Sequence, residues 1–373
     1  MRRVLGQVRG EEAGPTLIVV GGLHGNEPGG LRAAERVLAS IADARLELRG
    51  ELVALAGNVG ALREGRRYRV KDLNRQWTNE KVEALRARDP AHDDAEDAEQ
   101  RELLRHVEAA IGRARGDVYL VDLHTTSAAG HPFVLFGDTL PQRDFAIHLP
   151  LTIILGLEEQ VDGVLSEHMT RRGLVTYAVE GGQHDDPRSV DNLSAVLWIA
   201  LSGAGLLRAE ENPELASSLS RLEAARGDLP RVLEVLRRHP ISPEDGFRME
   251  PGFANLAPVR AGQRIATDVR GEILAPHDGY VMLPLYQGQG EDGFFWGRAV
   301  GGARLAASRI ARRLRVDGVL PLLPGVSRDA HHADRLRVDT RVARLYPLDV
   351  FHFFGFRKVR QEGDVLTVER SRH

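Results

Sequence analysis

The first half of the chain alternates short apolar runs with amphipathic helical segments, and this alternation constrains the fold more than any other feature. Residues 29–42 and 100–113 place apolar side chains at helical spacing. Five other runs are apolar and bounded by glycine or polar residues, as buried strands are: 16–22, 51–57, 117–124, 151–156 and 174–182. A repeated strand and helix order predicts an α/β domain around a mostly buried β-sheet.

The pattern changes after residue 207, so we divide the chain into four parts. Residues 1–207 form the α/β domain. A helical connector is predicted over 208–240, because it contains two polar helical segments, the second at 229–238. Short β runs punctuated by glycine and proline predict a small barrel-like β domain over 241–305. Residues 306–373 form a C-terminal extension to which we assign no chemistry.

Charge and composition narrow the class of partner. Lys+Arg 50 against Asp+Glu 53 gives a formal net charge of -3, without the basic excess that binds nucleic acids or anionic membranes. The apolar stretches are shorter than the ~20 residues that cross a bilayer, and the N-terminus lacks a signal-peptide pattern. We expect a cytoplasmic protein with a small-molecule partner, no nucleic acid and no membrane, and we leave a homo-oligomer open. The acidic stretch 89–102 is predicted as a solvated loop that leads into a helix.

Three side chains that can bind a metal follow the ends of predicted strands. His24 and Glu27 come directly after the run 16–22. His124 ends the run 117–124. In open α/β sheets, ligands bind at the carboxyl ends of the strands, so these side chains are expected at one edge. Because cysteine is absent, a metal would need histidine and carboxylate ligands, and a His/His/Glu set leaves the fourth position of tetrahedral zinc open. We predict one Zn²⁺ per chain here, although Co²⁺, Ni²⁺ or Mn²⁺ can also occupy such sites.

Two further carboxylates lie in predicted strands. Glu180 lies in the run 174–182, where apolar surroundings make a carboxylate costly unless it is paired or functional. A carboxylate that takes the proton of a metal-activated water contributes ~10²–10⁴-fold to a rate, and we predict this role for Glu180, with a structural helix cap as the alternative. Asp122 points to the same side of its strand as His124. It either orients that histidine or makes a strand-end hydrogen bond.

A polar segment between Gly65 and Trp77 contains clustered arginines and an amide, namely Arg67, Asn74 and Arg75. Guanidinium groups bind carboxylates in a two-pronged geometry, so this segment suits a substrate carboxylate; a solvated loop is the alternative. Five other histidines have polar or loop surroundings and are expected at the surface: His92, His131, His184, His331 and His332.

Four motifs in this order together resemble the succinylglutamate desuccinylase/aspartoacylase family, which has a zinc carboxypeptidase-like fold: GGLHGNEPGG, KDLNRQW, VDLHTT and VEGG. The resemblance covers roughly residues 15–300. It implies a mixed central β-sheet flanked by helices, followed by a smaller C-terminal β domain that shapes the substrate entrance. It also implies roles for matching residues: zinc ligation by His24, Glu27 and His124, general base catalysis by Glu180, carbonyl polarisation by Arg67, and binding of the substrate carboxylate by Asn74 and Arg75.

Two substrate-binding positions of the family have no clear counterpart here. The second arginine of aspartoacylases falls near Arg171 or Arg172, with a spacing to Glu180 that is one or two residues shorter. The family's C-terminal-domain tyrosine corresponds either to Tyr286 or to the pair 294–295, where two phenylalanines lack the hydroxyl. Both differences concern the choice of substrate.

These observations predict a zinc-dependent deacylase that cleaves the amide bond of an N-acyl amino acid, a carbon–nitrogen bond other than a peptide bond. Its substrate is a small molecule bearing a carboxylate, and Glu180 assists the attack of metal-bound water. A metallocarboxypeptidase that acts on short peptides is the alternative within the same fold, because KDLNRQW suits both substrates. A non-catalytic metal-binding module is the alternative outside enzymes.

Overall fold

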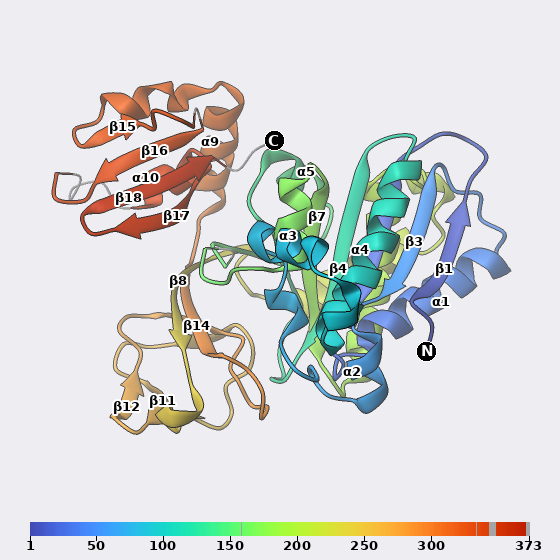
Figure 1. Cartoon of the computed structure of the whole chain (residues 1–373), viewed down its shortest axis with the longest axis horizontal. Helices are drawn as coiled ribbons and strands as arrows, with labels where there is room; N and C mark the ends of the chain where they lie inside the picture. Colours follow the sequence, from blue (N-terminus) through green and yellow to red (C-terminus); the bar gives the residue numbers. More distant parts are fainter. Residues whose placement is uncertain (158, 333, 343–347, 371–373) are drawn as a thin grey trace.

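A mixed β-sheet forms the centre of the molecule. The computed structural model describes residues 1–157, 159–332, 334–342 and 348–370 (Figure 1). Within these residues, one 11-stranded sheet has the order β1-β3-β2-β4-β7-β5-β6-β8-β14-β13-β10. The strands of its first eight positions are β1 (Val4–Arg9), β3 (Glu51–Ala56), β2 (Thr16–Gly21), β4 (Val118–Thr126), β7 (Val175–Gln183), β5 (Phe133–Leu135), β6 (Thr152–Leu155) and β8 (Val232–Pro240). β2 is parallel to β3 and β4, and β4 to β7, whereas β1 and β5 run antiparallel to their neighbours β3 and β7. The expected mixed sheet is confirmed.

Helices cover both faces of this sheet. Leu17 and Val19 of β2 pack on one face with α1 (Gly29–Asp43), α5 (Leu140–Ala146), α7 (Pro187–Gly203) and α8 (Leu215–Arg226). Ile18 and Val20 pack on the other face with α3 (Asn79–Ala87), α4 (Ala95–Arg113) and α6 (Leu165–Arg171). A strand buried on both faces has a continuous apolar sequence, which is why these runs were recognisable. The short helix α2 (Val59–Glu64) follows β3.

The acidic stretch 89–102 differs from the solvated loop that we predicted. Asp94 caps α4, and Glu96 in its first turn is fully buried. Glu96 accepts backbone hydrogen bonds from Arg69 at 2.8 Å and Val70 at 2.9 Å. A buried carboxylate is tolerated when several donors satisfy it, so this part of the stretch anchors the loop that follows Arg67.

The prediction of a second connector helix at 229–238 was wrong, because this segment forms β8. Its residues Val232–Val235 are buried, and the strand pairs in parallel with β6 and antiparallel with β14 (Asp292–Ala299). A short apolar run fits a helix and a strand equally well, and pairing along both edges of the segment decides between them. The helical part of the connector consists of α8 and the short 3₁₀ helix Ala209–Glu211.

Two smaller units follow the main domain in the sequence (Figure 1). The first combines β10 (Ala257–Val259), β13 (Gly279–Met282) and β14 with a three-stranded sheet of β9 (Arg248–Met249), β11 (Arg264–Asp268) and β12 (Gly271–Leu274). It is the expected small β domain. The second contains α9 (Gly302–Arg313), α10 (Leu348–Phe353) and an antiparallel sheet of β15 (Val326–Arg328), β16 (Arg335–Asp339), β18 (Val365–Arg370) and β17 (Phe356–Glu362). It has a hydrophobic core of its own, and we call it the C-terminal lobe.

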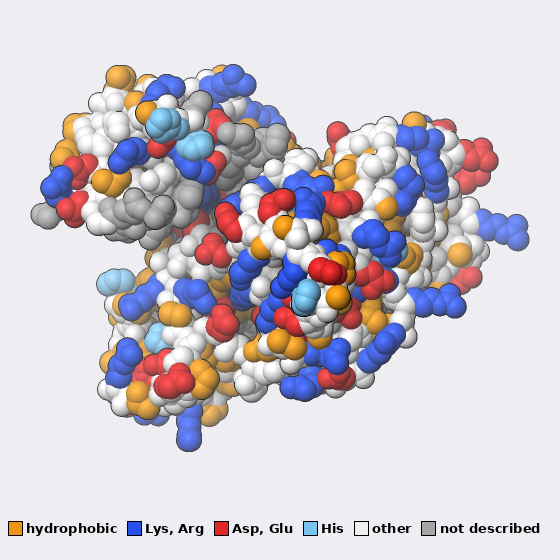
Figure 2. Space-filling view, viewed as in Figure 1, with side chains coloured by type: hydrophobic (Ala, Val, Ile, Leu, Met, Phe, Trp, Pro, Cys, Tyr) orange, Lys and Arg blue, Asp and Glu red, His pale blue; other side chains and the backbone are white. Residues whose placement is uncertain are grey.

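Charged side chains of both signs lie on the surface of the molecule. Figure 2 shows basic and acidic side chains interspersed over the visible face. Within the described ranges, every helix is too short or too polar to cross a bilayer.

Candidate metal centre and active site

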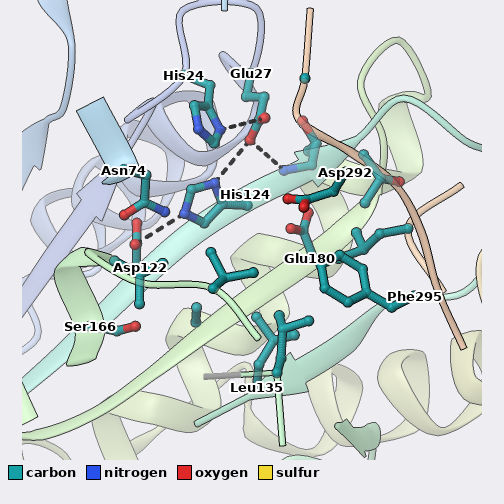
Figure 3. A pocket seen from close by; sticks show the side chains of 18 of the residues that line it. His24, Glu27, Asn74, Asp122, His124, Leu135, Ser166, Glu180, Asp292 and Phe295 are labelled. Carbon is teal, nitrogen blue, oxygen red and sulfur yellow. Dashed lines mark hydrogen bonds and ion pairs between the residues drawn. The ribbon is translucent and has the colours of Figure 1, made fainter. Parts of the chain in front are cut away.

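Two neighbouring parallel strands bring the three predicted metal ligands together. His24 and Glu27 follow β2, and His124 lies in β4, whose Leu123 is in register with Gly21 of β2. All three side chains are buried, and one ligand atom from each lies within 4.8 Å of the others. Figure 3 shows them facing one another above the pocket. Two imidazoles and one carboxylate at this spacing fit a single divalent cation.

The turn that carries His24 and Glu27 depends on Gly25. Its backbone N–H donates to the carbonyl of Arg67 at 3.1 Å, and a Cβ here would overlap the backbone of Ala61 and Arg66. Glycine is required because only a residue without a side chain permits this close approach. The turn after β2 is thereby held against the loop that presents Arg67.

Each candidate histidine ligand has one ring nitrogen beside Glu27 and the other beside a second carboxylate. In His24, Nδ1 lies 2.8 Å from Glu27 Oε1 and Nε2 lies 3.1 Å from Asp72 Oδ1. In His124, Nδ1 lies 3.1 Å from Glu27 Oε2 and Nε2 lies 3.0 Å from Asp122 Oδ2. A carboxylate behind a ligating histidine fixes its ring orientation and tautomer. The Nδ1 atoms, which face Glu27, are therefore the candidate ligand atoms, and Asp122 lies beside the other nitrogen of His124.

Neighbouring charges favour the ionised form of Glu27 and the protonated form of His124. Burial raises the pKa of Glu27, but His24 and His124 outweigh this effect and hold that pKa well below its usual range. Burial lowers the pKa of His124, but Asp122 and Glu27 outweigh it and raise that pKa well above its usual value. A protonated imidazole cannot bind a metal, so a cation entering here would displace a proton from His124.

Glu180 lies in β7 beside the cluster. It is in register with His124 of β4. Its Oε2 atom is buried and has no hydrogen-bond partner among the described residues. Burial raises the pKa of Glu180 to about 8, with His124 opposing the shift and Glu27 adding to it. An unpaired carboxylate with a pKa near neutrality has the properties of a general base.

Arg67 and Asn74 reach the pocket from the loop after α2. Asp72 accepts from the Arg67 Nη2 at 2.9 Å, and the Arg67 Nη1 lies 3.6 Å from Glu27 Oε1. The Asn74 side-chain oxygen accepts from the backbone N–H of Leu165 at 2.9 Å. Its amide nitrogen therefore stays available as a donor to a bound ligand.

Arg75 is held by the small β domain. Its Nη2 lies 3.1 Å from Asp292 Oδ2 at the start of β14, and the other oxygen of Asp292 pairs with Arg238 of β8. The β domain thus contributes directly to the position of Arg75. Asp292 was missed in the sequence, because nothing in a local pattern indicates which distant arginine it meets. Asp72 was also missed, although it lies in KDLNRQW, five residues after Arg67.

A cavity of about 170 Å³ joins these side chains, and all seven predicted site residues line it. In Figure 3, His24 and Glu27 lie at one end of this pocket, whereas Leu135 and Phe295 lie towards the other. The pocket lies at the carboxyl edge of β2, β4 and β7, where ligands bind in open α/β sheets.

His184 lies in the pocket and not at the surface as we expected. Its Nδ1 is 2.8 Å from the hydroxyl of Thr125, and its Nε2 is 3.4 Å from both the Asn26 amide and Gln287. The Asn26 amide also donates to Gln287 at 2.8 Å. Its place two residues beyond the end of VEGG was the available signal.

The candidates for the two unclear family positions lie in different surroundings. Arg171 and Arg172 lie outside the pocket lining and form ion pairs with Glu167 and Glu108. Of the two aromatic alternatives, Phe295 lines the pocket. The hydroxyl of Tyr286 instead donates to the Glu250 carbonyl at 2.6 Å.

The mixed sheet and this pocket place the chain among α/β proteins with a candidate metal site at the carboxyl edge of the sheet. Residues 13–155 match the succinylglutamate desuccinylase/aspartoacylase catalytic domain. This part of the chain is similar to the catalytic domain of that family, and it carries six of the seven predicted site residues, all except Glu180.

Curated relatives are similar to short stretches of this chain. The succinylglutamate desuccinylase of Photorhabdus laumondii is 35% identical over 74 residues, which cover 20% of this chain and 23% of that protein. That of Burkholderia thailandensis is 33% identical over 115 residues, covering 31% of this chain and 32% of the relative. The matched stretches thus span a third or less of these relatives.

Similar folds occur in two solved structures that each cover 79% of this chain and 88% of their own. One is the succinylglutamate desuccinylase/aspartoacylase of Rhodobacter sphaeroides, with a TM-score of 0.57 and 19% identity. The other is the product-bound ectoine utilization protein EutE (DoeB) of Ruegeria pomeroyi, with a TM-score of 0.55 and 21% identity. At these identities the likeness concerns the fold.

Proposed function

We propose that this protein is a zinc-dependent hydrolase that cleaves the amide bond of an N-acyl amino acid. One observation carries the proposal. The buried group of His24, Glu27 and His124 shares its pocket with the unpaired carboxylate of Glu180. The names of the family and of its desuccinylase relatives support deacylation as the reaction.

The donor set suits zinc, and the surrounding residues supply the remaining functions. Zn²⁺ bound at this site would polarise the scissile carbonyl as a Lewis acid and lower the pKa of a water molecule. Glu180 accepts a proton from the attacking water and passes it to the leaving nitrogen. Arg67 donates to the oxyanion that develops on the carbonyl oxygen. The products are a free amino acid and a carboxylic acid.

Asn74 and Arg75 hold the substrate by its carboxylate. The free amide hydrogens of Asn74 and the guanidinium of Arg75 lie in the same pocket as Arg67. Charge-assisted hydrogen bonds to a carboxylate fix both its position and its orientation. Holding the substrate in this way places the scissile amide between Glu180 and the group of His24, Glu27 and His124. Proximity then favours attack by water on the amide carbon.

Release of free amine tests the proposal. We expect zinc-loaded protein to hydrolyse N-acyl amino acids and to leave dipeptides intact; the reverse preference would identify a metallocarboxypeptidase. Glu180→Gln is expected to lower kcat by at least ~10²-fold, because it removes the general base, with an unchanged zinc content. Glu83→Gln, which changes an exposed carboxylate on α3, is the matched control. Full activity of Glu180→Gln would disprove this mechanism, and zinc binding with an inactive wild type would favour the non-catalytic module.

A further inference from the structure

The pocket has few cations with which to bind acidic groups. Among the described lining residues, Arg67 and Arg75 are the only arginines, and no lysine is present. Arg67 lies between Asp72 and Glu27, and Arg75 is paired with Asp292. In the proposed reaction, the oxyanion and the substrate α-carboxylate use both of these guanidinium groups. Neither is left for a second carboxylate.

Much of the pocket wall is apolar. The hydrogen bond from Leu165 N–H to the Asn74 side chain places the start of α6 directly beside the amide that holds the α-carboxylate. Six apolar side chains line this part of the pocket and its neighbouring wall: Leu135, Leu157, Val161, Val164, Ala178 and Phe295. Leu135 and Phe295 lie below Glu180 in Figure 3. A substrate side chain that leaves the α-carbon in this direction meets hydrocarbon.

Three hydroxyl side chains, Ser166, Thr170 and Thr176, also line the pocket, and two of them are already engaged. Thr170 and Thr176 hydrogen-bond to each other at 2.6 Å. The amide of Gln142 donates to both, at 2.9 and 3.1 Å. A side chain entering here would have to break these bonds to obtain a polar partner from Thr170 or Thr176.

The carboxylates in the lining do not change this balance of charge. Glu167 is paired with Arg171, Asp292 is paired with Arg75 and Arg238, and Glu291 is exposed. Arg171 and Arg172, the two positions that resembled an acid-binding arginine, lie outside the lining. Succinylglutamate, by its chemistry, presents three carboxylates and N-acylaspartate two. Each carboxylate beyond the first would be buried without a cation, which is strongly unfavourable.

We infer that the pocket selects N-acyl amino acids with an uncharged, apolar side chain and rejects substrates with a second carboxylate. This inference rests on the proposed function and names the substrate class of the same site. When the polar groups of a site do not match those of a substrate, kcat/KM for that substrate falls by a large factor. We expect kcat/KM for N-acetyl-leucine to exceed that for N-acetylaspartate and N-succinylglutamate by at least ~100-fold.

The test compares these three compounds and N-acetyl-lysine on the zinc-loaded full chain, by release of free amine. Binding is measured in parallel from the shift in Tm that each compound produces, with and without zinc. Hydrolysis with a preference for leucine is expected. Faster hydrolysis of an acidic or a lysine substrate would overturn the inference and leave the deacylase function standing. If no compound is hydrolysed and only N-acetyl-leucine shifts the Tm, the proposed hydrolase function would be refuted, whereas the inferred preference of the pocket for an apolar side chain would stand. No turnover and no shift from N-acetyl-leucine would overturn both.

Variants of the apolar wall sharpen the test. Leu135→Arg adds a cation and is expected to raise kcat/KM for N-acetylaspartate at least ~10-fold, since a charge-assisted hydrogen bond contributes that much. Leu135→Gln, of intermediate size and no charge, should lower the leucine activity without this gain. Leu274→Arg, at a position of β12 that is 48% exposed and outside the pocket, should change neither. An equal gain in Leu135→Gln would show that the charge of the wall does not set the preference.

Discussion

Asp138 holds the C-terminal lobe against the main domain, and its removal should therefore release the lobe. Its side chain is 1% exposed. It accepts hydrogen bonds from Arg312 of α9 at 2.7 Å, from Arg143 of α5 at 3.0 Å, and from Arg357 of β17. Burial raises the pKa of Asp138, but the three guanidinium groups outweigh it and hold that pKa well below its usual range. Gly137, the preceding residue, lines the pocket.

The variant Asp138→Asn isolates the charge from the shape. Asp138 has a φ of 60°, and asparagine tolerates this left-handed conformation as well as aspartate does. The substitution leaves three arginines around a neutral amide. Removing one partner of a buried ion pair typically costs about 3–5 kcal/mol, and we expect a loss of stability in this range.

Urea unfolding and limited trypsin digestion measure the effect. In Asp138→Asn, we expect the C-terminal lobe to unfold at a lower urea concentration than in the wild type, and trypsin to cleave faster between α9 and β18. Asp144→Asn is the matched control, because Asp144 of α5 also pairs with arginines of α9, Arg309 and Arg313, but is 44% exposed. An exposed pair contributes at most about 1 kcal/mol. Equal losses in the two variants would refute the view that burial of the charge decides the docking.

Three other changes have defined outcomes. Asp72→Asn weakens the hold on His24 and should reduce zinc affinity about 10–100-fold, as measured by competition with a chelator; unchanged affinity would exclude the orienting role. Gly25→Ala should lower both the Tm and the zinc occupancy, because the added Cβ displaces the loop that carries Arg67; a wild-type Tm would contradict this packing argument. Burial raises the pKa of Glu234, but His352 and Arg298 outweigh it and lower that pKa to about 2. Its contribution to stability should therefore be present above its unfolded value of 4.5 and be lost as the pH falls from about 4.5 to 2. The urea midpoint of Glu234→Gln should depend less on pH in this window than that of the wild type. The same pH profile in both proteins would rule out a contribution of Glu234 to stability.

The sequence was most informative where strands are buried on both faces. β2, β4 and β7 have continuous apolar sequences, so their positions were predictable without knowledge of their neighbours. Because parallel strands end at one edge, His24 and His124 were expected to meet there, and they do. Local sequence also indicated that Asp122 points to the same side as His124.

Features that depend on distant partners were not predictable in this way. β8 was assigned as a helix because its apolar residues satisfy either period, and only pairing with β6 and β14 makes it a strand. The docking of the C-terminal lobe joins Asp138 to arginines that follow 174 and 219 residues later. Periodicity carries no information about such contacts.

The most direct test of the central claim is zinc-dependent release of free amine from an N-acyl amino acid. The protein would be assayed as loaded with one zinc per chain, then after removal of the metal by a chelator, and again after zinc is returned. We predict hydrolysis that disappears with the metal and returns with it, and that is absent throughout in Glu180→Gln. Hydrolysis that persists at full rate in the metal-free protein would contradict the claim.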